Sequence, residues 1–238
     1  MLVLDTALLA AAAILVYKKG ALDLKGVVAA FFVGVITLEL GGWIPFLALF
    51  VFLLTGTLAT KFKYHEKARR KIAEGKRGVR SWGNVLGNGL VAALLIVLEY
   101  VTKKDVVWAA TFASIATANA DTLASELGKV YGRNPRLITN LHRRVEPGTN
   151  GGVTLQGELF ALIGAAIIAL ISIPLFENRA GAFLSVLIGG VLGCNADSVI
   201  GATLEERGWF NNDMTNFSAT AVGALMGALA FGALTGSL

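Results

Sequence analysis

Long apolar segments alternate with short polar connections along most of the chain. Eight apolar segments can be delimited, at about residues 2–16, 26–42, 43–60, 83–101, 106–122, 153–175, 182–200 and 217–237. Most of them have the length of a membrane-spanning α-helix, roughly 17–25 residues. The short segments of alternating polarity that are typical of a transmembrane β-barrel do not occur in the sequence. The pattern predicts an all-α, polytopic membrane protein with about eight transmembrane helices.

Composition agrees with this fold class. Hydrophobic residues make up 55% and charged residues 16% of the 238 residues, and the mean hydropathy is +0.67, whereas a soluble domain has roughly 25% charged residues. The first segment lacks a basic N-terminal region and a convincing cleavage site, so it predicts a transmembrane helix and not a signal peptide. Cys194 is the single cysteine, which excludes an intrachain disulfide.

The distribution of Lys and Arg predicts an orientation. Eighteen of the 21 basic residues lie in the connections 18–25, 61–81, 123–152 and 203–216, and the remaining three are Lys103, Lys104 and Arg179. By the positive-inside rule we expect the four basic connections in the cytoplasm and both termini on the extracytoplasmic side of the cell membrane. The net charge of +5 has the same explanation, and we expect no nucleic-acid partner. The 61–81 connection either only sets this orientation or also attracts anionic lipid or a nucleotide.

Two related tripeptides, Asn119-Ala120-Asp121 and Asn195-Ala196-Asp197, indicate an internal repeat. Each precedes a T-N-x-x-small-T-x-x-G sequence, at residues 149–157 and 215–223, and residues 81–89 give a weaker third match. We predict one transmembrane domain, 1–238, with an N-terminal helix pair at 1–42 and parallel repeat units at about 43–105, 106–180 and 181–238. In the first unit Gly56 aligns with the two acids. Small residues recur in any membrane bundle because they let helices pack, but this does not account for the Asn-x-Asp and Thr-Asn matches.

Asp121 and Asp197 are the first candidates for chemistry, since acids inside apolar segments are costly and usually functional. On a continuous helix, Asp121 shares one face with Ala124, Ser125, Gly128 and Gly132. The opposite face would hold Asn119, Thr122 and Glu126. This helix is therefore either polar on both sides or broken near Asn119. A pair of carboxylates suits Mg²⁺, which prefers oxygen ligands and substrate phosphates.

The segment before the sixth helix is rich in glycine. Residues 146–152 read Glu-Pro-Gly-Thr-Asn-Gly-Gly, and such a segment at a helix N-terminus binds anions, although a flexible turn with a helix cap is the alternative. The phosphate-binding candidates here are Gly148, Thr149, Asn150, Gly151 and Gly152, supported by Lys129, Arg143 and Arg144. The other amides at the starts of helices are Asn84, Asn88 and Asn216. They predict either a shared polar site or hydrogen bonds between helices.

These motifs together resemble a known family. Residues 119–128, then 147–153, then 195–198 with Gly201-Ala202 resemble the DUF92 (TMEM19-like) integral membrane family. Plant members of that family include the phytyl-phosphate kinase of tocopherol synthesis, so the resemblance implies phosphoryl transfer to an isoprenyl monophosphate. The spacing of Asp121, Ala124, Gly128 and Gly132 is also similar to the D-x-x-A-x-x-x-G-x-x-x-G motif of CTP-dependent lipid kinases, which favours CTP as the donor.

We therefore expect a kinase, embedded in the lipid bilayer, that transfers a phosphoryl group from a nucleoside triphosphate, with CTP favoured, to an isoprenyl or polyprenyl monophosphate. Mg²⁺ would be held by Asp121 and Asp197 on the cytoplasmic side. The expected catalytic residues are Asp121, Asp197, Glu126, Asn119 and Asn195. The expected nucleotide- and phosphate-binding residues are Gly128, Gly132, Lys129, Arg143, Arg144, Gly148, Thr149, Asn150, Gly151, Gly152, Asn84, Asn88 and Asn216. The alternatives are a transporter or flippase of an anionic lipid or solute, and a cytidylyltransferase that makes a CDP-lipid.

Overall fold

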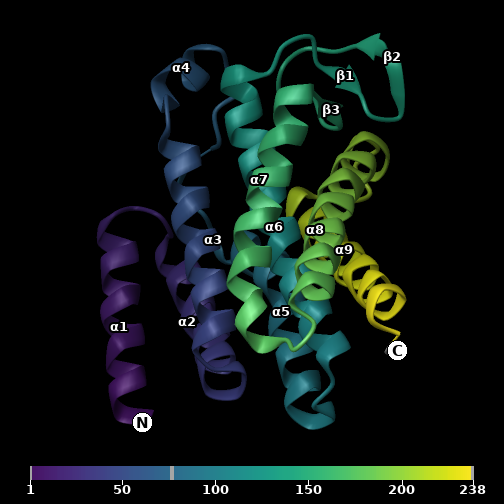
Figure 1. Cartoon of the computed structure of the whole chain (residues 1–238). Helices are drawn as coiled ribbons and strands as arrows, with labels where there is room; N and C mark the ends of the chain where they lie inside the picture. The colour runs from purple at the N-terminus through teal and green to yellow at the C-terminus, as the bar shows by residue number, and fades with distance from the viewer. Residues whose placement is uncertain (1, 76–77, 237–238) are drawn as a thin grey trace.

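Long helices pack side by side in one bundle in the computed structural model, which describes residues 2–75 and 78–236 (Figure 1). The eight predicted segments correspond to eight long helices: α1 (Leu2–Lys18), α2 (Leu24–Ile36), α3 (Trp43–Lys61), α5 (Trp82–Thr102), α6 (Asp105–Tyr131), α7 (Leu155–Ser172), α8 (Arg179–Ile200) and α9 (Asn212–Thr235). A short helix, α4 (Tyr64–Arg69), lies between α3 and α5. The prediction of an all-α, polytopic architecture is confirmed.

Three helices continue into turns of different winding. α2 runs into the π-helical turn η1 (Thr37–Gly41), α7 into the 3₁₀ turn η3 (Ile173–Leu175), and α8 into the π-helical turn η4 (Gly201–Glu205). With these extensions, six helices in the described part of the chain are long and apolar enough to cross a membrane, and they contain α2, α3, α5, α7, α8 and α9. Helix α1, with 17 residues, is shorter than these spans.

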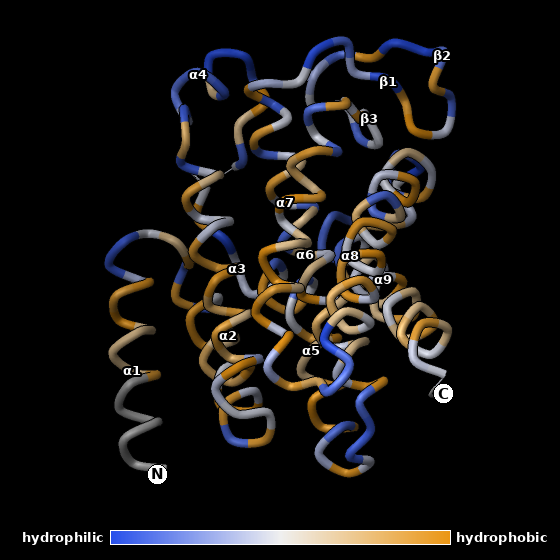
Figure 2. The backbone as a smooth tube through the Cα atoms, in the orientation of Figure 1, coloured by the Kyte–Doolittle hydropathy of each residue, from blue (hydrophilic) through white to orange (hydrophobic). Residues whose placement is uncertain are grey.

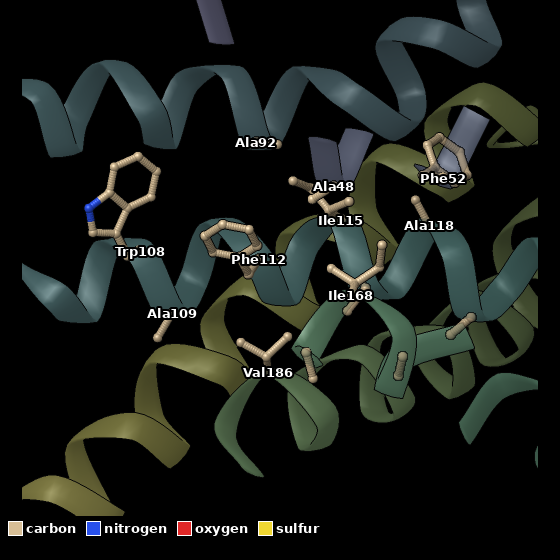
Figure 3. Close-up of a cluster of buried hydrophobic side chains, with 14 of the residues drawn as sticks. Ala48, Phe52, Ala92, Trp108, Ala109, Phe112, Ile115, Ala118, Ile168 and Val186 are labelled. Atoms are coloured by element: carbon tan, nitrogen blue, oxygen red, sulfur yellow. The ribbon is translucent and has the colours of Figure 1, made fainter. Parts of the chain in front are cut away.

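Helix α6 lies at the centre of the bundle and is enclosed by other helices. Every residue from 107 to 120 is buried, and α6 contacts α3, α5, α7, α8 and α9. Figure 3 shows Phe112 and Ile115 of α6 among Ala92, Ile168 and Val186, which come from three neighbouring helices. Because α6 does not face lipid along this stretch, it can be rich in Ala, Ser and Thr, and its hydropathy falls below that of the lipid-facing spans.

Glycines let the neighbouring helices approach α6 closely. A Cβ atom on Gly164 of α7 would lie 2.9 Å from the Cα atom of Ala120. A Cβ atom on Gly190 of α8 would lie 2.8 Å from the Cβ atoms of both Ala116 and Ala165. Such contacts between small residues are the usual way in which membrane helices pack tightly.

The structure differs from the prediction in the connection 123–152. Helix α6 ends at Tyr131, so it continues beyond the predicted end at residue 122 and does not break at Asn119. The connection also contains a three-stranded antiparallel sheet in the order β2-β1-β3, formed by β1 (Arg136–Leu137), β2 (Asn140–Arg144) and β3 (Gly152–Val153). Strands this short carry too few alternating positions to be recognised from sequence.

The longer polar connections gather at one end of the bundle. Figure 2 shows hydrophilic segments around α4 and β1–β3, and both ends of the described chain point towards the opposite end. Of the basic residues in the 61–81 connection, Lys76 and Arg77 lie outside the described residues. The predicted repeat units each contain two long helices, α3 with α5, α6 with α7, and α8 with α9. The repeat itself and the cytoplasmic location of the basic end stay predictions.

A buried ion pair fixes α4 to the rest of the bundle. Lys67 of α4 has no exposed surface, and its ammonium group donates to the carbonyl oxygens of Ala59 (3.0 Å) and Thr60 (2.9 Å). The same ammonium group forms an ion pair with the Oε2 atom of Glu126, and the Oε1 atom of Glu126 forms a second ion pair with Lys129 at 3.0 Å. A cation at the C-terminus of α3 satisfies carbonyl groups that lack a partner within the helix.

We expect Lys67→Met to destabilise the protein by about 3–5 kcal/mol, because removing one partner of a buried pair leaves the other without compensation. Thermal unfolding in detergent micelles measures this loss. The matched control is Lys63→Met, because Lys63 and its partner Glu66 are both exposed by nearly half and an exposed pair contributes about 1 kcal/mol or less. Equal melting temperatures for the two variants would contradict the structural role of Lys67.

Candidate functional site

A polar cavity of about 290 Å³ opens at the basic end of the bundle. Residues of α6, α7 and α8 line it, together with the glycine-rich segment 147–152, which we call the glycine loop. Ten of the residues predicted from the sequence line this main cavity: Asp121, Asp197, Gly128, Gly132, Lys129, Gly148, Thr149, Asn150, Gly151 and Gly152. Segments far apart in the sequence therefore contribute to a single site.

Two carboxylates, Asp121 from α6 and Asp197 from α8, line the main cavity. The Oδ2 atom of Asp197 is buried and has no hydrogen-bond partner within the described residues. The ion pairs in that part of the chain use other acids, namely Glu66, Glu99 and Glu126. A buried carboxylate oxygen without a partner is costly, so a ligand or cation is the expected partner of Asp197.

Two further acids of the main cavity are held by hydrogen bonds. The Oε2 atom of Glu158 accepts from the amide of Asn195 at 3.1 Å, and the Oε2 atom of Glu205 accepts from the hydroxyl of Thr215 at 2.8 Å. Asn195 thus orients an acid of the cavity and is not itself among the lining residues. No group of three or more His, Cys, Asp or Glu side chains within 2–75 and 78–236 is arranged to hold a metal ion.

The two aspartates nevertheless fit part of a magnesium site. Mg²⁺ is usually bound through one or two carboxylates, several waters and the phosphates of a substrate, and not by a cage of protein ligands. The unpartnered Oδ2 atom of Asp197 is a donor of the kind that such an ion takes. The absence of a third carboxylate ligand is therefore compatible with an ion that arrives with a nucleotide.

The glycine loop lies directly against α8 and is anchored to the small sheet. Gly151 has a φ angle of +71°, and a Cβ atom there would lie 2.7 Å from the carbonyl oxygen of Ser198. The carbonyl oxygen of Gly151 accepts from the backbone N–H of Ile138 at 2.8 Å. The loop leads into α7, whose first turn is capped by the hydroxyl of Thr154, which accepts from Gly157 N at 3.0 Å. The sheet thus holds the loop over the two aspartates.

A smaller polar cavity of about 70 Å³ adjoins the main cavity. Asp121 lines both cavities, as do Glu74, Ser125 and Asn212. The smaller cavity also brings together Asn84, Asn88 and Asn216, together with Glu126. The first two are held in place, since Asn84 donates to the Asp213 carboxylate at 3.1 Å and Asn88 donates to the carbonyl of Asn84 at 2.9 Å.

The remaining candidates lie elsewhere. Arg143 and Arg144 are exposed on β2 and line neither cavity. Asn119 is fully buried; it accepts from the hydroxyl of Thr55 at 2.6 Å and donates to the carbonyl of Gly164 at 2.8 Å. Asn119 therefore joins α3, α6 and α7 within the bundle. α6 is polar on both faces because each face meets a different partner.

Sequence reasoning missed the charged residues Glu74 and Arg80 of the smaller cavity. Both belong to the 61–81 connection, for which the sequence left open whether it only sets the orientation or also attracts anionic lipid or a nucleotide. The available clue was the position of Arg80 immediately before α5, whose first turn carries the predicted site residue Asn84. The Asn84 side chain is tied to this helix start, because it accepts from the backbone N–H of Ser81 at 3.2 Å. The direction of the Arg80 side chain depends on tertiary packing.

Comparisons with known proteins agree with this architecture. The sequence matches the family described as integral membrane protein DUF92 over residues 7–224. An uncharacterized membrane protein of Methanocaldococcus jannaschii is 35% identical over 92% of this chain and 90% of its own length. An uncharacterized membrane protein of Synechocystis is 33% identical over 93% of this chain and 86% of its own length.

A plant relative is more distant. Protein VTE6, chloroplastic, of Arabidopsis thaliana is 27% identical over 87% of this chain and 65% of its own length. No solved structure matches the chain significantly. The extent of the family match and the identity to the archaeal and cyanobacterial proteins show that the chain belongs to the DUF92 family of integral membrane proteins.

Proposed function

We propose that this protein is a membrane-embedded kinase that transfers the terminal phosphoryl group of a nucleoside triphosphate, preferably CTP, to an isoprenyl or polyprenyl monophosphate. The observation that carries the proposal is the buried, unpartnered carboxylate oxygen of Asp197, which lies with Asp121 in a polar cavity under a glycine loop. Carboxylates, a glycine-rich loop and a lysine in one cavity suit the binding of a metal–nucleotide complex.

The residues of the main cavity would bind either the metal ion or the nucleotide phosphates. Asp121 and Asp197 would hold Mg²⁺, which neutralises phosphate charge when it is bound. Backbone N–H groups of the glycine loop and the N-terminal turn of α7 would face the nucleotide phosphates, with Lys129 nearby. The cavity volume of about 290 Å³ suits a triphosphate better than a whole nucleotide, so the nucleoside would extend towards solvent.

The transfer itself needs little covalent help from the protein. An oxygen of the acceptor phosphate forms a bond to the terminal phosphorus of the donor while the bond from that phosphorus to the bridging oxygen breaks, and a nucleoside diphosphate leaves. The acceptor phosphate is already ionised, so no proton has to be removed from it. Catalysis then depends on alignment and on electrostatic stabilisation, as is usual in phosphoryl transfer. This fits a site that lacks a histidine among its lining residues.

Family resemblance supports the choice of acceptor. The DUF92 family, which the motifs of this sequence resemble, includes a plant phytyl-phosphate kinase, and a chloroplast relative is 27% identical to this chain. We further propose that the basic end of the bundle faces the cytoplasm, where nucleotides are available, and that both termini lie on the other side of the cell membrane.

Purified protein with Mg²⁺, geranylgeranyl or phytyl monophosphate and labelled CTP or ATP tests the proposal. A label in the terminal phosphate of the donor is expected to appear in a lipid diphosphate. A label in the α-phosphate that appears in the lipid would instead identify a cytidylyltransferase that makes a CDP-lipid. If no labelled lipid forms with either donor, the kinase proposal is wrong.

Asp121→Asn and Asp197→Asn are each expected to lower kcat by about 10²–10³-fold, the loss typical of removing one electrostatic stabiliser of a transition state. Asp105→Asn is the matched control, because Asp105 is an exposed acid in the first turn of the same helix as Asp121, and it is expected to keep full activity. Turnover measured at saturating donor and acceptor separates these variants. An unchanged kcat for Asp197→Asn would contradict the role that the proposal gives to this carboxylate.

Gly151→Ala is expected to raise the KM for the nucleotide by about tenfold or more, because the new methyl group would collide with α8 and displace the glycine loop from its anion-binding position. Gly208→Ala is the control. Gly208 also has a positive φ angle, +73°, but a Cβ atom there would have open space. The two variants share the same backbone strain, so a difference in nucleotide KM reports the loop contact; equal KM values would argue against a role for the loop.

A further inference from the structure

A third cavity, of about 120 Å³, lies between α1, α2, α3 and α5 and is lined almost entirely by apolar side chains. Its aromatic residues are Phe31, Phe46, Phe50 and Phe52. The exceptions to its apolar character are Arg80 and Asn84. The proposed donor site at Asp197 does not use this apolar cavity.

The three cavities form a series. Arg80 and Asn84 line both the apolar cavity and the smaller polar cavity, and Asp121 lines both the smaller polar cavity and the main cavity. An apolar space among membrane helices is thus joined through Arg80 to the carboxylates. From the apolar cavity to the main cavity, the lining changes from apolar side chains to the cation of Arg80, then to the carboxylate of Asp121, and finally to the glycine loop.

The guanidinium of Arg80 has no ion-pair or hydrogen-bond partner in the described chain. It lies over the ring of Phe52, with 5.5 Å between its central carbon and the ring centroid. Burial lowers the pKa of Arg80, while the nearby acids Glu74, Glu126 and Asp121 act in the opposite direction. Arg80 is partly buried, an arginine remains charged in proteins, and a buried cation without an anion in direct contact is unfavourable. The guanidinium is therefore available to an anion from outside the chain.

The backbone holds Arg80 in this position. Its N–H donates to the carbonyl of Ala21 at 3.0 Å, and its carbonyl accepts from the N–H of Asp23 at 3.0 Å. The side chain passes over Gly56 of α3, where a Cβ atom would lie 2.8 Å from a guanidinium nitrogen. Gly56 is the position that aligns with Asp121 and Asp197 in the sequence comparison. Asp121 and Asp197 carry acids at the aligned positions, whereas the lack of a side chain at Gly56 leaves room for the Arg80 guanidinium.

We propose that the apolar cavity takes the first part of the acceptor's prenyl tail and that Arg80 pairs with the acceptor's phosphate, on the opposite side of Asp121 from the nucleotide. This inference rests on the proposed kinase function, and it assigns the acceptor subsite. The ligand combines an apolar chain with a phosphate, as the cavity combines apolar walls with one unpaired cation. The rest of a long tail lies in the bilayer.

Binding of radiolabelled geranylgeranyl monophosphate to protein in lipid nanodiscs tests the subsite without requiring turnover. Arg80→Ala is expected to weaken this binding by about tenfold or more, the loss typical of a hydrogen bond to a charged group, and to leave CTP affinity unchanged. Arg80→Lys keeps the charge and is expected to fall between Arg80→Ala and the native protein. Arg143→Ala, at an exposed arginine outside the cavities, is expected to bind the lipid normally.

Competition identifies which part of the ligand is recognised. Unlabelled geranylgeranyl monophosphate is expected to displace the label, whereas geranylgeraniol, inorganic phosphate and phosphatidic acid at equal concentration are expected to displace little. Displacement by phosphatidic acid to the same extent would overturn the prenyl assignment in favour of a general anionic-lipid site. Displacement by inorganic phosphate to the same extent would overturn the role of the apolar cavity.

A second variant tests the tail subsite and keeps the proposal falsifiable if Arg80→Ala does not fold. Ala30→Phe on α2 fills part of the apolar cavity, which Ala30 lines. It is expected to weaken binding of geranylgeranyl monophosphate by about tenfold, because the ring takes the space of the first part of the tail, whereas Ala29→Phe, at the neighbouring position of α2 that does not line the apolar cavity, is expected to bind normally. An equal effect of the two substitutions would contradict the proposed position of the tail.

The two proposals fail in different ways. If the protein phosphorylates prenyl monophosphates but Arg80→Ala and Ala30→Phe leave acceptor KM and binding unchanged, the kinase proposal holds and the acceptor subsite is wrong. If lipid binding depends on Arg80 and on the space beside Ala30 but no diphosphate forms with CTP or ATP, the binding subsite stands and the kinase proposal is wrong.

Discussion

The enclosure of α6 is the constraint on which the rest of the structure depends. Five long helices pack against α6, and no face of it is free between residues 107 and 120. Only small side chains, or larger ones that fit a matching space, can occupy such a helix, which accounts for its many Ala, Ser and Thr residues and for glycines such as Gly190 on its neighbours. Asp121 follows this stretch immediately and is the first charged residue of α6 after Asp105. It thus lies where the packed core gives way to the polar cavities.

Much of the fold could be predicted from the sequence because lipid imposes a simple rule. A helix that faces lipid must be apolar over most of its length, so the lipid-facing helices were visible from their hydropathy. The segment of the enclosed helix α6 was visible because residues 106–120 carry no charge. The convergence of Asp121 and Asp197 on one cavity could also be anticipated, from two tripeptides with the same residues. The asparagines of α5 and α9 were visible in the same way, by their positions at the starts of helices.

Other features depend on contacts between residues distant in sequence. Helical spacing placed Asn119 and Glu126 opposite Asp121, but their partners, Thr55 and Lys67, are 64 and 59 residues away in the sequence. Arg80 could not be distinguished from the other basic residues of its connection, because its lack of a partner appears only once α1, α2 and α3 are packed around it. The small sheet was invisible for a different reason: its strands are too short to show a period.

The π-helical turn η4 sets the register of the acidic residues at the end of α8. Asp197 and Glu205 are eight residues apart, and at about 100° per residue in an α-helix they would differ in direction by about 80°. A π-turn acts as the insertion of one residue into an α-helix, which reduces the effective separation to seven and the difference to about 20°. The wider turn therefore brings Glu205 back to the face of Asp197, and both acids line the main cavity. A single extra residue in the winding of one helix thus decides how much negative charge the cavity holds.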